Sequence, residues 1–105
     1  MALRSITLST AEAQPIVETQ FGESTAVTTV YFCNRSSVAC TVNVYAVDAN
    51  ALPGTTNVIY NSLVIAGNDT YVMEAEKLIL QNGDILAANA SANSSVVATA
   101  SYVGI

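Results

Sequence analysis

In the stretch Lys77-Leu-Ile-Leu-Gln-Asn-Gly-Asp-Ile-Leu-Ala-Ala-Asn-Ala90, two apolar runs flank the pair Asn82-Gly83. Asn followed by Gly best tolerates the positive φ angles of a type I′ turn, so the stretch predicts a hairpin with a two-residue turn. The predicted pairs are Gln81 with Asp84, Leu80 with Ile85, Ile79 with Leu86, and Leu78 with Ala87. Because side chains alternate between the faces of a strand, both faces of this hairpin would be apolar. We therefore expect it at the centre of an all-β module, with the core on one side and a partner protein on the other.

The composition points to a domain that packs against other proteins. A chain of 105 residues is long enough for one domain with its own core. Apolar residues make up 51% of the chain and charged residues only 10%, against about 25% in typical globular proteins. Ser, Thr and Asn together number 30, and a neutral surface of hydroxyls and amides suits close protein–protein contact.

Charge and hydropathy exclude two classes of partner. The net charge is −5, and Arg4, Arg35 and Lys77 are the only cations, too few to follow a nucleic-acid backbone. No run approaches the ~18 apolar residues of a membrane span. The first ten residues lack the continuous apolar segment of a secretory signal. We therefore expect a protein made in a cytoplasm that binds neither nucleic acid nor membrane.

From Ala26 onward the sequence alternates between strand patterns and turn signals. Val42, Val44 and Ala46 would share one face of their strand, and the connection 34–39 has the length of a hairpin loop. Counting the N-terminal segment, we expect seven to eight strands and no long helix. This pattern predicts an antiparallel β-sandwich, either immunoglobulin-like or jelly-roll, and does not choose between them. The expected strands are 26–33, 40–48, 58–66, 70–74, the two arms of the hairpin (the second ending near Ser91), and 96–103.

Residues 1–25 differ from the sandwich domain proper, residues 26–105. Residues 3–8 predict a short strand, and Ser9–Gln14 predicts one helical turn, capped by Ser9 and ended by Pro15. Two alternatives follow. The segment is either an edge strand plus a loop of the same domain, or an arm that lies on a neighbouring subunit.

The sequence offers little for catalysis. It contains no His and no Trp, so the commonest general base is missing. Glu74 and Glu76 lie two residues apart, but they flank an expected connection rather than a cleft. We expect these carboxylates to be solvated turn charges, and we predict no catalytic residue and no cofactor.

Metal and disulfide sites are also weakly indicated. Asn68, Asp69 and Asp84 offer oxygen ligands for calcium, but no loop has the acid spacing of a known calcium loop, and Asp in such turns usually bonds nearby backbone amides. We expect no metal. Cys33 and Cys40 pair only if the loop places them directly opposite; a cytoplasmic origin favours free thiols.

Protein–protein contact is the function that the aromatic residues favour. Large amphipathic rings on a surface of low charge are typical of interfaces, and stacking on sugar is the rival use. The interface candidates are Tyr31, Tyr45, Tyr60, Tyr71 and Tyr102, with Ile79 and Leu86 from the hairpin.

Several stretches of the sequence, taken together in chain order, are similar to those of one known group of proteins. They are Val30-Tyr-Phe-Cys-Asn-Arg35, Val42-Asn-Val-Tyr-Ala-Val47, Asp69-Thr-Tyr-Val72, Glu76-Lys-Leu-Ile-Leu80, Asn82-Gly-Asp84, Ala90-Ser91, and a last strand ending near Ser101-Tyr102. From Thr29 onward the chain resembles small virion structural proteins of tailed bacteriophages, notably of marine cyanophages and their T4-like relatives.

The resemblance implies a β-sandwich displayed on a virus particle, and it carries over no catalytic residue. The expected function is that of a non-enzymatic capsid decoration or cement protein, present in multiple copies and forming homo-oligomers. The alternative is a neck, tail or fibre component, including a module that binds host glycans. The expected partners are other virion proteins, either the major capsid protein or neck and tail proteins, after synthesis in the bacterial host cytoplasm.

Overall fold

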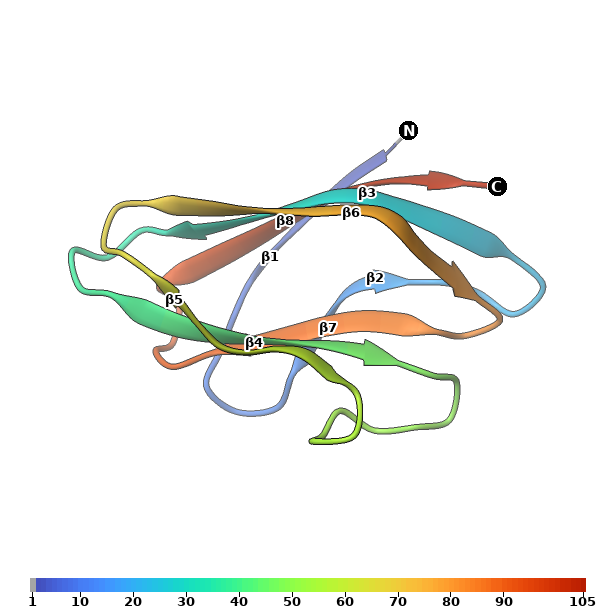
Figure 1. Ribbon diagram of the computed structural model, residues 1–105, viewed down its shortest axis with the longest axis horizontal. Coiled ribbons are helices and arrows are strands. Elements are labelled where there is room, and N and C mark those ends of the chain that lie inside the picture. The colour runs from blue at the N-terminus through green and yellow to red at the C-terminus, as the bar shows by residue number, and fades with distance from the viewer. Residues whose placement is uncertain (1) are drawn as a thin grey trace.

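The chain forms eight strands that lie in two layers (Figure 1). The computed structural model describes residues 2–105, apart from the side chains of residues 75–77. The strands are β1 (Ala2–Thr7), β2 (Gln14–Glu18), β3 (Ser24–Asn34), β4 (Cys40–Val47), β5 (Val58–Ile65), β6 (Thr70–Gln81), β7 (Ile85–Ala90) and β8 (Val96–Gly104).

The order of the strands identifies a jelly roll. One sheet has the order β1-β8-β3-β6 and the other β2-β7-β4-β5, and all neighbours are antiparallel. β1 pairs with β8, β2 with β7, β3 with β6 and β4 with β5. This nested pairing results when one long hairpin is rolled up so that its successive strand pairs fall in alternate sheets. An immunoglobulin-like sandwich would instead place its first, second, fifth and fourth strands together. The predicted antiparallel sandwich is thus confirmed, and of its two forms the chain adopts the jelly roll.

The core lies between the two sheets and is filled by alternate residues of each strand. In β4, Cys40, Val42 and Val44 are buried, while Thr41 and Asn43 between them are partly exposed, as the period of two requires. β7 and β8 contribute mainly alanines, which leave room for Phe32 of β3. The largest fully buried side chains include Phe32, Leu8, Ile16, Ile65, Leu86, Val27, Val30, Val42, Val44 and Val96.

The predicted Asn-Gly turn is present, but the hairpin is not. Asn82 and Gly83 have φ angles of 47° and 91°, and the Asp84 N–H donates to the Gln81 carbonyl at 3.0 Å. β6 then belongs to one sheet and β7 to the other, so the predicted pairs beyond this turn, from Leu80–Ile85 to Leu78–Ala87, are wrong.

Burial explains why the two strands separate after the turn. In a continued hairpin Leu80 and Leu86 would point to opposite faces, and one of them would stay in water. In the structure both are buried, with 3% and 0% of their surface exposed, because each reaches the core from a different sheet. Removing apolar surface from water favours this arrangement.

The connection 35–39 shows the same behaviour. It joins β3 in one sheet to β4 in the other, so its prediction as a hairpin loop is also wrong. Cys33 and Cys40 consequently lie in different sheets, and both are free thiols. Only the β4–β5 connection, residues 48–57, joins two strands of the same sheet.

The N-terminal residues form the first two strands of the sandwich. β1 pairs with β8 and β2 with β7, one at the edge of each sheet. The predicted helical turn at Ser9–Gln14 is wrong: residues 8–13 are a loop with bends, and β2 begins at Gln14. Pro15 lies within β2, where the register with β7 shifts. Proline is tolerated there because an edge strand need not donate on its free side.

Candidate binding surfaces

The outer face of the β1-β8-β3-β6 sheet, which we call the β3 face, carries little charge among its described side chains. The β-ladders place Tyr31 between Val72 and Thr99, and Ala26 between Ile79 and Val103. Tyr31, Val72 and Ile79 have 42%, 45% and 52% of their surface exposed. Leu3 of β1 adds a further exposed aliphatic side chain. Hydroxyls lie beside these apolar groups, and those of Ser5 and Thr99 form a hydrogen bond of 2.8 Å.

Among the side chains that the structure describes, Glu74 is the one charged group in these outward rows. It lies opposite Thr29 and is exposed. Arg4 belongs to the other row of β1, because it pairs with the buried Ala100. A partner that covers the described part of the β3 face would therefore need to desolvate one carboxylate.

The edges of the two sheets differ in regularity. β2 contains Pro15 and a register shift, and the pairing of β6 with β3 shifts between Val27 and Thr29. β5 carries a bulge at Ser62, whose φ is 58° and whose N–H donates to Asn43 Oδ1 at 2.7 Å. β1 alone pairs without any shift in the described chain. Bulges and prolines prevent edge-to-edge pairing, so β1 is the edge most open to another strand.

The five tyrosines do not form one surface. Tyr31 lies on the β3 face and Tyr45 on the outer face of the other sheet, whereas Tyr60, Tyr71 and Tyr102 pack against the core. The rings of Tyr60 and Tyr71 meet edge to face, with centroids 6.1 Å apart. Burial, followed by the neighbouring Tyr71 phenol, raises the pKa of Tyr60.

The two interface candidates from the predicted hairpin differ in exposure. Ile79 is exposed on the β3 face, as an interface residue must be, but Leu86 is fully buried in the core. The prediction of Leu86 as an interface residue is therefore wrong, because it assumed that β6 and β7 share a sheet.

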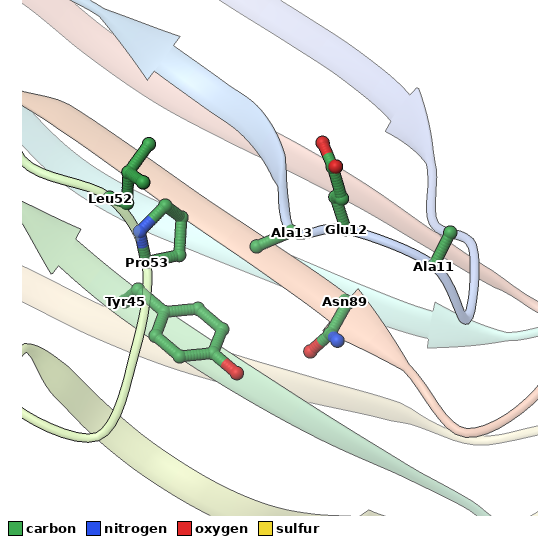
Figure 2. Close-up of a pocket in the computed structure, with 7 residues that line it drawn as sticks. All are labelled: Ala11, Glu12, Ala13, Tyr45, Leu52, Pro53 and Asn89. Atoms are coloured by element: carbon green, nitrogen blue, oxygen red, sulfur yellow. The ribbon is translucent and has the colours of Figure 1, made fainter.

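A pocket of about 350 Å³ lies on the outer face of the β2-β7-β4-β5 sheet. Tyr45 of β4 and Asn89 of β7 form its floor, and the loops β1–β2 and β4–β5 form its walls (Figure 2). Asn89 Oδ1 is buried and accepts no hydrogen bond from the described residues. We call this site the Tyr45 pocket; its walls are Ala11, Glu12, Ala13, Leu52 and Pro53. Sequence reasoning singled out Tyr45 but missed Glu12 and Asn89, which only the fold brings near it.

The carboxylates considered for chemistry do not gather. Asp69 and Asp84 follow turns at opposite ends of β6, so the calcium site of Asn68, Asp69 and Asp84 is not assembled (Figure 1). Each instead bonds backbone: Asp69 Oδ1 accepts from Thr70 N at 2.8 Å and Asp84 Oδ2 from Gln81 N at 3.0 Å. Glu74 is exposed on the β3 face, and the side chain of Glu76 lies outside the described residues. No group of three metal-ligating side chains occurs in the part of the chain that is described.

Comparison with known proteins does not assign this chain to a family. No protein-family model matches the sequence, and neither a curated protein nor a solved structure matches the chain. No membrane-spanning helix is found among residues 2–105.

Proposed function

We propose that this chain is a non-enzymatic structural protein of a tailed-bacteriophage virion. In this proposal it is a decoration protein that is made in the bacterial cytoplasm and attaches in multiple copies to the major capsid protein. A place in the neck, tail or fibre is the alternative position within the same function. The sequence resemblance supports the virion, and the β3 face supports attachment to other proteins.

The single observation that carries the proposal is the β3 face with its exposed apolar side chains and one described carboxylate. Each Å² of apolar surface removed from water contributes about 25 cal/mol, while the hydroxyls beside it exchange water for partner groups at little net cost. A monomer gains nothing from leaving the neighbours Tyr31 and Val72, and Ile79 farther along β6, in water. Exposed apolar patches of this kind mark interaction sites.

The regular edge of β1 supports association between copies. Its six residues pair with β8 on one side, and no strand lies on the other. A second copy that adds its own β1 in antiparallel orientation would join two four-stranded sheets and place the two β3 faces side by side. Such a pair would present a larger continuous surface to a capsid.

The test is binding of purified chain to virions assembled without it. Ile79→Glu and Tyr31→Glu each place a carboxylate on the β3 face, and we expect each to reduce the bound copies at least about tenfold, because a charge must then be desolvated at the contact. Val64→Glu is the matched control, since Val64 is 65% exposed on the opposite sheet and should bind as the unmodified chain does. Circular dichroism checks that all three variants remain folded.

Two results would contradict the proposal. One is the absence of this chain from purified virions of the phage that encodes it. The other is equal loss of binding for Val64→Glu and Ile79→Glu, which would show that the β3 face has no special part in attachment. The position of the chain in an image reconstruction of the particle would then distinguish capsid from neck, tail and fibre.

A further inference from the structure

The Tyr45 pocket has the lining of a ligand site on a face that the proposed attachment leaves free. It lies on the outer face of the β2-β7-β4-β5 sheet, whereas the β3 face belongs to the other sheet. Its volume of about 350 Å³ falls at the lower end of the range for small-molecule sites, about 300–1,000 Å³. A ligand bound there would remain accessible while the β3 face is covered.

The floor of the pocket combines an aromatic ring with an amide. Tyr45 and Asn89 come from neighbouring strands, and Figure 2 shows the Tyr45 hydroxyl and the Asn89 amide directed toward one another. The ring of Tyr45 is partly exposed, so that its surface is open to a ligand. Such a floor offers both an apolar surface for stacking and polar groups for orientation.

The amide of Asn89 has unused capacity for hydrogen bonding. Its Oδ1 is buried and accepts no bond from the described residues, and leaving a buried polar group unpaired is unfavourable. The amide of Asn43, the cross-strand neighbour of Asn89, makes no hydrogen bond to this oxygen. A ligand hydroxyl would supply the missing donor, and the amide NH₂ can donate to a second oxygen.

The walls define the remaining chemistry. Leu52 and Pro53 form an apolar wall on one side, and the exposed carboxylate of Glu12 lies on the rim opposite. A carboxylate accepts hydrogen bonds from two hydroxyls at once. The pocket has no cationic lining residue, and the chain carries a net charge of −5, so anionic ligands such as phosphates or acidic sugars are disfavoured.

We infer that the Tyr45 pocket binds a neutral carbohydrate unit. The ligand must present an apolar C–H face to Tyr45 and Pro53 and adjacent hydroxyls to Asn89 and Glu12. A hexose unit of a neutral oligosaccharide has both features on one ring. The pocket is open to solvent on one side, so that we expect weak affinity for a single unit, with Kd on the order of 1 mM. Multiple copies on one particle would strengthen attachment to a glycan-coated surface through avidity.

The test is titration of the full ¹⁵N-labelled chain with lactose, maltose, cellobiose and mannobiose, followed by NMR. We expect saturable shifts for at least one of these sugars at residues lining the pocket. Tyr45→Ala should weaken that binding about tenfold or more because the stacking surface is lost, and Asn89→Leu should weaken it about fivefold. Tyr31→Ala is the matched control; it removes a tyrosine from the β3 face and should leave the affinity unchanged.

Three outcomes would overturn the inference. The first is that none of the four sugars causes a shift up to about 10 mM. The second is that Tyr31→Ala and Tyr45→Ala weaken binding equally. The third is that 3′-sialyllactose binds through its acidic sugar and not through a neutral one. Tyr45→Phe keeps the ring and the fold, so it serves as the second variant if Tyr45→Ala unfolds. The result is independent of virion attachment, since Ile79→Glu should bind the sugar as the unmodified chain does.

Discussion

The two ends of the sandwich perform the same task by different means. At each end the chain crosses between sheets and the crossing must be held in place (Figure 1). At one end, which we call the Asn34 end, a fully buried amide joins the connections β3–β4 and β5–β6. At the other, the Gly83 end, the crossing is held by the backbone of a tight turn and by the half-buried carboxylate of Asp84.

The Asn34 end depends on one side chain. Asn34 has no exposed surface, and its Nδ2 donates to the carbonyls of Val38 at 2.9 Å and Ile65 at 3.1 Å. Its Oδ1 accepts from Ser36 N at 3.0 Å. The two connections approach so closely that a Cβ added to Gly67 would collide with the Ser37 carbonyl.

The Gly83 end spreads the same function over several weaker contacts. Asp84 accepts from Gln81 N at 3.0 Å and from Ala49 N at 3.2 Å, and Gly22 N donates to Asn82 Oδ1 at 2.9 Å. The comparison teaches that a buried polar group concentrates stability in one residue, whereas an exposed turn distributes it. Four predictions test this difference.

Asn34→Ala should have the largest effect. It leaves buried carbonyls and the Ser36 N–H without their partner, and we expect a loss of about 3 kcal/mol in the free energy of unfolding. Urea denaturation followed by circular dichroism measures it. Ser62→Ala, at the exposed bulge of β5, is the control and should stay within about 0.5 kcal/mol. A smaller loss of unfolding free energy for Asn34→Ala than for Gly83→Val, described next, would contradict the proposed difference between the two ends.

Gly83→Val should cost about 2 kcal/mol, because a β-branched residue resists the φ of 91° found there. The added Cβ would also lie 3.3 Å from the Ala49 Cβ. Gly54→Val is the matched control, since Gly54 has open space around it and should change stability by less than about 0.5 kcal/mol. Thermal unfolding measures both. Equal stability of the two variants would show that Gly83 does not hold a strained turn.

Asp84→Ala should cost about 1 kcal/mol, because two backbone N–H groups lose their acceptor but remain near water. Asp84→Asn retains one carbonyl oxygen and should lose about half as much. The midpoints of chemical denaturation of Asp84→Ala and Asp84→Asn measure the two losses. A loss for Asp84→Ala as large as that for Asn34→Ala would mean that the two ends do not differ in the way described.

The smallest effects are expected at the two asparagines with positive φ. Asn82→Gly loses the bond from Gly22 N and should cost about 0.5 kcal/mol. Asn68, at the Asn34 end, has a φ of 59° and receives no side-chain bond within the described residues, so Asn68→Gly should be neutral within about 0.3 kcal/mol. A larger loss for Asn68→Gly would contradict the assignment of stability at that end to Asn34.

The candidate surfaces were only partly predictable from the sequence. Tyr31 and Ile79 were correctly expected at the surface, because exposure on a strand follows from its period of two. Tyr60 and Leu86 were misplaced, since burial depends on which strands face each other across the core. Glu12 and Asn89 carried no signal. Their meeting at the Tyr45 pocket depends on two loops folding over the same sheet.

By itself, the sequence determined the all-β class, most strand positions and the Asn-Gly turn, because each depends on the alternation and turn chemistry of neighbouring residues. Only the tertiary structure decided which strands pair. The two-residue turn after Gln81 is compatible both with a hairpin and with a crossing between sheets. The choice was made by the core, which buries Leu80 and Leu86 together only when β6 and β7 lie in opposite sheets.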